Sequence, residues 1–135
     1  MTKIYIVVLC IVVTGIDLGE KKLALSKDLV AASATPLILS ILAEGENYGY
    51  SIIKRVKELS KDEIQWADGM LYPVLHRLEQ QGLVESKMKI SETGRKRKYY
   101  RLKDKGAGML KEQKQQWMIV HSVLEKLWEK KTCLT

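Results

Sequence analysis

The basic residues of this chain are concentrated in one short segment, residues 86–103, which reads SKMKISETGRKRKYYRLK. The segment holds eight of the 23 Lys and Arg residues and a single acid, Glu92. Its net charge of +7 equals that of the whole chain, so the basic and acidic residues outside the segment are equal in number. Solubility needs no such clustering, and a charge field this local is typical of a site that binds a polyanion. The alternative is a solvated charged hairpin without a partner.

No catalytic constellation accompanies this segment. His76 and His121 lack Cys or carboxylate partners at ligand spacing, and Cys10 and Cys133 lie near opposite ends of the chain, so the sequence indicates neither a metal site nor a disulfide framework. No phosphate-binding or dinucleotide-binding glycine motif occurs, which predicts that no nucleotide cofactor is bound. We therefore expect a binding protein rather than an enzyme, without metal or cofactor, in a reducing, cytoplasmic compartment.

The basic segment itself is predicted to form a hairpin. Val84, Met88 and Ile90 occupy apolar strand positions, and residues 99–102 alternate in the same way. Residues 92–95 form the expected turn, in which a glycine is free to adopt positive φ. The turn places cations at the tip of a ribbon that can lie along a phosphate backbone. The residues of this ribbon expected to contact DNA are Lys87, Lys89, Thr93, Gly94, Arg95, Lys96, Arg97 and Lys98.

Helical periodicity precedes the ribbon. Residues 26–34 are expected to form a short helix. The Thr-Pro pair at residues 35–36, as N-cap and first helical position, is expected to start a separate helix that ends at residues 44–47. A further helix follows the YGY motif at residues 48–50 and ends near residues 59–60.

The next predicted helix begins at Asp68, its expected N-cap, and is ended by Gly82. Pro73 lies one turn in and is expected to distort the first turn. The helical spacing turns five apolar side chains toward the core: Met70, Leu71, Val74, Leu75 and Leu78. The residues expected to read base edges lie on or beside the opposite face, with support from the preceding helix: Tyr72, His76 and Arg77, then Ser51 and Lys54.

After the ribbon, Asp104 is expected to cap a long helix that ends near Lys130. Its apolar residues recur with the 3-4-3-4-3 spacing of a heptad seam, which Gln113 interrupts. A stripe this long is difficult to bury against one small domain, so we expect pairing with a second copy of the chain. The alternative is that the helix folds back on its own domain. The expected dimerisation residues are Leu110, Trp117, Val120, Leu124 and Leu127.

An apolar run, residues 4–13, stands apart from this pattern. Its ten residues are too few to span a bilayer, which takes about twenty. We interpret residues 1–25 as an extension outside the fold, residues 26–103 as the DNA-binding domain and residues 104–131 as the dimerisation helix. A β-branched strand that pairs with another segment is the second interpretation of the run, and a membrane-binding surface is a weaker third one.

Helices, a two-stranded wing and one long helix define a winged helix-turn-helix, a mainly α (α+β) fold whose third helix enters the major groove. The motifs of this chain resemble those of the PadR family of bacterial transcriptional regulators over about residues 26 to 130. They are the YGY motif at residues 48–50, LYPVLHRLE at residues 71–79 with GLV at residues 82–84, and GRK at residues 94–96 followed by YYRL at residues 99–102. Their order and spacing make the resemblance specific.

The resemblance implies a homodimeric repressor that binds a pseudo-palindromic operator and dimerises through its last helix. Some members of the family take flat aromatic or cationic compounds in a cleft between the subunits, and Trp117 and Trp128 would suit such a cleft. A winged-helix adaptor that binds only proteins is the alternative. The basic wing favours the regulator, because an adaptor has no need for seven net positive charges there.

Overall fold

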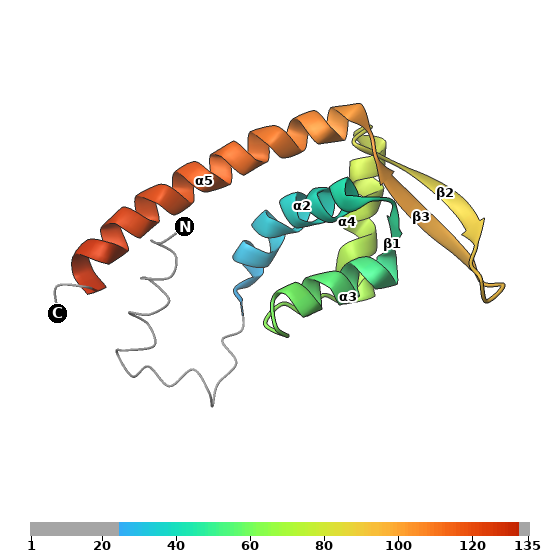
Figure 1. Cartoon of the computed structure of the whole chain (residues 1–135), viewed down its shortest axis with the longest axis horizontal. Coiled ribbons are helices and arrows are strands. Elements are labelled where there is room, and N and C mark those ends of the chain that lie inside the picture. The colour runs from blue at the N-terminus through green and yellow to red at the C-terminus, as the bar shows by residue number, and fades with distance from the viewer. Residues whose placement is uncertain (1–24, 133–135) are drawn as a thin grey trace. The chain divides into compact units, whose positions relative to one another are not determined.

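The computed structural model describes residues 25–132, whose helices and strands are labelled in Figure 1. Their bounds are α2, Lys27–Glu44; β1, Asn47–Tyr48; α3, Gly49–Leu59; α4, Asp68–Gln80; β2, Val84–Ile90; β3, Lys96–Leu102; and α5, Asp104–Thr132. The apolar run at residues 4–13 lies outside the described residues. Ala24–Gln113 forms one compact unit, and α5 beyond Gln113 belongs to another. Within residues 25–132 no helix combines the length and apolarity that a membrane span requires.

Helix α2 is one continuous helix, so the predicted boundary at Thr35-Pro36 is wrong. The Ser26 side chain caps it by accepting the Leu29 N–H at 3.2 Å. Pro36 removes one hydrogen bond from the helix interior. Apolar residues on both sides of Pro36 are buried in the core, and their burial outweighs that loss: Ala34, Ile38, Leu39, Ile41 and Leu42.

Helix α4 packs its leucine stripe into the same core as α2 and α3. Its N-cap is Ala67, so Asp68 lies one position later than predicted, in the first turn, where a carboxylate complements the helix dipole. The helix also runs continuously through Pro73. Helices α3 and α5 and strands β2 and β3 also contribute to this core. Its buried residues include Ile52, Val56, Leu71, Leu75, Leu78, Leu83, Val84, Tyr100 and Leu110.

The end of α4 is set by local backbone chemistry, as predicted. Gly82 adopts φ +75°, and its N–H donates to the Glu79 carbonyl at 3.0 Å. The Leu83 N–H donates to the Leu78 carbonyl at 3.0 Å. This pair of bonds is the Schellman arrangement, which favours glycine at its left-handed position. It turns the chain from α4 directly into β2.

The hairpin is part of a three-stranded antiparallel sheet with the order β1-β3-β2. Strands β2 and β3 pair from Val84 opposite Leu102 to Ile90 opposite Lys96. The turn between them closes as predicted, with Gly94 at φ +81° and its N–H donating to the Ser91 carbonyl at 2.9 Å. Figure 1 shows residues 84–102, hereafter the wing, projecting away from α2, α3 and α4. The two-residue strand β1 was not predicted, because two residues show no alternation.

Candidate nucleic-acid interface

Helix α4 exposes a polar face opposite its leucine stripe. Four residues at helical spacing form this face, and all are exposed: Gly69, Pro73, His76 and Gln80. His76 was predicted to lie here. Gly69 and Gln80 were not among the predicted contact residues, although their spacing from His76 could have identified them. Gly69 has open space where a Cβ would lie, so the backbone of α4 is accessible near its N-terminus.

Tyr72 lies at the junction of α3 and α4 and is 44% exposed. Its ring packs over Gly49, and a Cβ at Gly49 would lie 2.8 Å from the ring. The glycine between the two tyrosines of the YGY motif therefore makes room for Tyr72. On α3, the predicted contact residue Lys54 is exposed and Ser51 is half-buried.

Arg77 is the predicted α4 contact residue that the structure places apart from His76. Its Nη2 donates to the Thr35 Oγ1 of α2 at 3.3 Å. Arg77 therefore lies on the side of α4 that faces α2. The structure does not bring Arg77 together with Tyr72, which packs on the α3 side.

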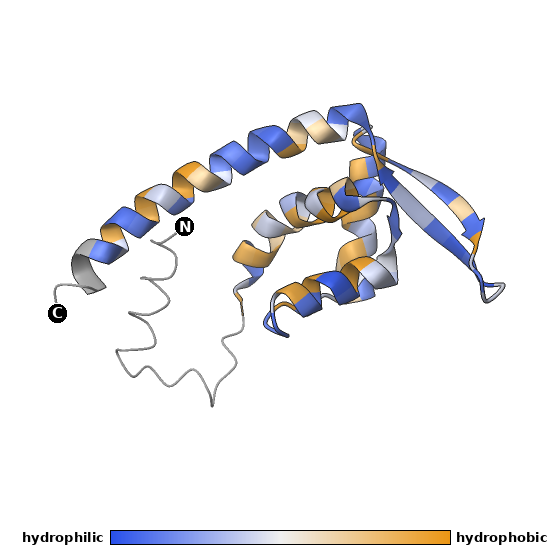
Figure 2. Ribbon diagram, in the orientation of Figure 1, coloured by the Kyte–Doolittle hydropathy of each residue, from blue (hydrophilic) through white to orange (hydrophobic). Residues whose placement is uncertain are grey.

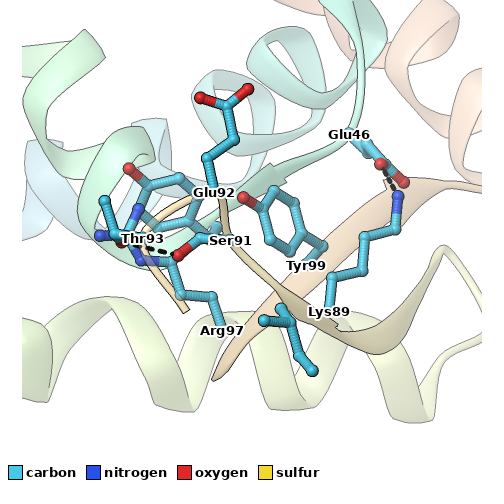
Figure 3. Close-up of a pocket in the computed structure, with 9 residues that line it drawn as sticks. Glu46, Lys89, Ser91, Glu92, Thr93, Arg97 and Tyr99 are labelled. Atoms are coloured by element: carbon cyan, nitrogen blue, oxygen red, sulfur yellow. Dashed lines mark hydrogen bonds and ion pairs between the residues drawn. The ribbon is translucent and has the colours of Figure 1, made fainter. Parts of the chain in front are cut away.

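The cations of the wing fall into two groups. Within the part of the chain that the structure describes, the exposed side chains of Lys87, Arg95 and Lys96 contact neither an acid nor an aromatic ring. Lys98 in contrast lies 3.9 Å from the Glu79 carboxylate of α4. Lys89 is also engaged, through an ion pair with Glu46 that Figure 3 shows, and Arg97 lies over the Tyr48 ring. The wing thus holds unpaired cations, two of them near its tip, and uses the others in contacts within the chain.

Lys89 and Arg97 belong to a stack of aromatic and charged side chains on one side of the sheet. The Arg97 guanidinium lies 4.4 Å from the centroid of the Tyr48 ring, and that ring meets Tyr99 edge-on at 5.3 Å. The Lys89 ammonium lies 5.5 Å from the Tyr99 centroid and pairs with Glu46. Figure 3 shows these side chains lining a shallow pocket beside the turn. The stack ties β2 and β3 to β1, which leads into α3.

Glu79 ties the wing to α4 from the other side. Its carboxylate accepts a hydrogen bond from the Ser86 hydroxyl of β2 and faces Lys98 of β3. Burial raises the pKa of the nearby Tyr100 hydroxyl, and the negative charge of Glu79 adds to this effect. Tyr100 is therefore neutral at physiological pH. The wing is therefore held on both of its faces, by Glu46 and Tyr48 on one and by Glu79 of α4 on the other.

One of the predicted dimerisation residues of the long helix α5 lies elsewhere than expected. Leu110 is only 5% exposed and lies in the core of its own domain, so it is not available to a dimer seam. The helical spacing could not show this, because it does not indicate where the domain core ends. Beyond Gln113, α5 exposes apolar side chains that include Trp117, Val120, Leu127 and Trp128, and Leu124 is half-buried.

Three helices followed by an antiparallel wing, with a polar face on the last of the three, define a winged helix-turn-helix protein. Among the described residues, no group of three or more His, Cys, Asp or Glu side chains could hold a metal ion. Residues 38–112 match the Transcriptional regulator PadR-like family, and the chain belongs to this family. The resemblance found in the sequence is confirmed, and so are the fold and the regulatory rather than enzymatic class.

Several known transcriptional regulators are similar to this chain in sequence or in fold. A PadR-like transcriptional regulator from Bacillus cereus is 31% identical, covers 76% of this chain and 98% of its own, and superposes with a TM-score of 0.68. A transcriptional regulator from Clostridium thermocellum is 30% identical, with coverages of 76% and 97% and a TM-score of 0.69. The transcriptional regulator YqjI of Escherichia coli is 31% identical over 80 residues, which are 59% of this chain and 37% of YqjI.

Proposed function

We propose that this PadR-like regulator is a homodimeric repressor that binds a pseudo-palindromic operator. The observation that carries the proposal is the exposed polar face of α4 beside a wing with unpaired cations. In this arrangement α4 enters the major groove, where His76 and Gln80 face base edges, with Tyr72 at the margin. Residues 26–103 form the DNA-binding domain, and residues 104–131 form the dimerisation helix, whose first turns also complete the core of the DNA-binding domain.

The electrostatic part of this proposal predicts a steep dependence of DNA affinity on salt. If each subunit neutralises about three to five phosphates, the log–log plot of affinity against salt should have a slope near −0.9 for each contact. Fluorescence anisotropy with a labelled duplex over a KCl series measures the slope. A slope near zero, or no binding to any duplex at low salt, would contradict the proposal and favour the protein-binding adaptor.

The dimer part of the proposal is supported by the exposed apolar side chains of α5 beyond Gln113. Trp117, Val120 and Leu127 are 38%, 53% and 57% exposed. Together with the half-buried Leu124 they continue the heptad spacing over three turns. Pairing this stripe with a second copy removes it from water and places two wings and two α4 helices on one DNA duplex.

Trp117 and Trp128 support an effector site in the same helix. Both are exposed, at 38% and 50%, and the family resemblance implies a cleft between the subunits that takes flat aromatic compounds. A planar aromatic cation should then quench tryptophan fluorescence and change operator affinity in the same titration. By linkage the operator must change the affinity for the compound by the same factor. Quenching without any change in operator affinity would contradict an effector role.

A further inference from the structure

The register of the wing separates its side chains into two faces. Strand residues alternate between faces, and paired residues share one. Lys89 pairs with Arg97 on the face of the stack, whereas Ile90 pairs with Lys96 and Met88 with Lys98 on the other. Lys96 and Arg97 are thus neighbours in sequence that point in opposite directions. We call the face with Met88, Ile90, Lys96 and Lys98 the open face.

Near the turn, the stacked face is already occupied by contacts within the chain, whereas Lys87, opposite Tyr99 and farther from the turn, is the exposed cation of this face. Arg97 is half-buried over the Tyr48 ring, and Lys89 is half-buried between Glu46 and the Tyr99 ring. Moving either cation to a phosphate would break a contact that holds the wing to β1. These two cations therefore have a positioning role in the free protein.

The open face carries two apolar side chains that nothing in the described chain covers. Met88 is 58% exposed and Ile90 is 70% exposed. In Figure 2 the ribbon has hydrophobic positions near the end of β2, in a wing that is otherwise mainly hydrophilic. Lys96 lies beside Ile90, and Arg95 follows the turn, so the patch is bordered by unpaired cations. An apolar patch bordered by positive charge is complementary to a groove that has an apolar base and anionic groups on either side.

We propose that the tip of the wing meets DNA through its open face, with Ile90 and Met88 entering the minor groove. This inference rests on the proposed function. Deoxyribose and base edges supply the apolar floor, and phosphates on either side meet Lys96 and Arg95. Apolar side chains are common minor-groove contacts in DNA-binding proteins. A second copy of the chain is a poor occupant, since two open faces would bring like charges together.

Three single variants test this division of the wing. Ile90→Ser should lower affinity for a duplex about tenfold, because an apolar contact is lost, and should leave the salt slope unchanged. Lys96→Ala should reduce the slope by about 0.9 for each bound wing. Arg97→Ala should leave the slope unchanged and instead speed amide hydrogen exchange in β2 and β3. Leu59→Ser, at a side chain of α3 that is 59% exposed, is the matched control and should bind as the wild type does.

Netropsin, which occupies the minor groove of A·T-rich DNA, tests the groove assignment. It should weaken binding of the wild type to an A·T-rich duplex and weaken binding of Ile90→Ser less. The inference is overturned if Ile90→Ser binds as tightly as the wild type, if Arg97→Ala reduces the slope as much as Lys96→Ala, or if netropsin has no effect. Each of these results requires wild-type binding, so the proposed function stands in each. Absence of wild-type binding at low salt would overturn the proposed function itself. Capture of the wing by an acidic protein instead of DNA would also overturn the inference.

Discussion

A Val120→Asp substitution is expected to convert the dimer into monomers and to lower operator affinity about 100-fold or more. Val120 is 53% exposed in the described chain, so the change should leave the fold of each subunit intact. In the proposed dimer the new carboxylate is buried without a partner, at a cost of about 3–5 kcal/mol. A monomer then engages one half-site and loses the gain of binding two linked sites.

Light scattering and DNA-binding titrations of the same preparations measure this effect. Gln115→Asp is the matched control, since it places the same charge on α5 at an exposed position away from the heptad seam. It should remain dimeric and bind the operator as the wild type does. If Val120→Asp kept the dimer mass at micromolar concentration, the seam would lie elsewhere on α5. If the wild type itself had the monomer mass, the dimer proposal would be wrong.

Gly106→Ala is expected to destabilise the protein by about 1–3 kcal/mol through overpacking. Gly106 is buried in the first turns of α5, and an added Cβ would overlap the Leu83 carbonyl oxygen and press on Leu102. The Leu83 carbonyl cannot move away freely, because it accepts the Lys103 N–H at 3.0 Å and the Leu83 side chain is buried. The junction of α4, β2 and α5 must therefore distort.

The control for this prediction lies two residues further along the same helix. A Cβ at Gly108 meets nothing within 4 Å, so Gly108→Ala should stabilise the protein by about 0.5–1 kcal/mol through helix propensity. Urea unfolding at one fixed protein concentration measures both variants, because the stability of a dimer depends on concentration. Equal stabilities of the two variants would show that α5 does not approach Leu83 as closely as the structure indicates.

Features that depend on neighbouring residues could be predicted from the sequence. The Gly82 cap and the Gly94 turn were predicted because each needs only a positive φ at one position, which glycine adopts without strain. The leucine stripe of α4 was predicted because helical spacing places those residues on one face. The basic wing could be recognised because its charges lie within one short segment, and the family motifs identified the class of protein through their order and spacing along the chain.

Features that depend on partners far away in the chain could not be predicted. The continuity of α2 through Pro36, the burial of Leu110 in the domain core and the pairing of β1 with β3 all result from tertiary packing that outweighs local preference. The clearest example is which cations of the wing are paired within the chain and which are not. Lys96 and Arg97 have equivalent local sequence contexts, and only the position of Tyr48, brought alongside β3 by the fold, engages one of them and leaves the other unpaired.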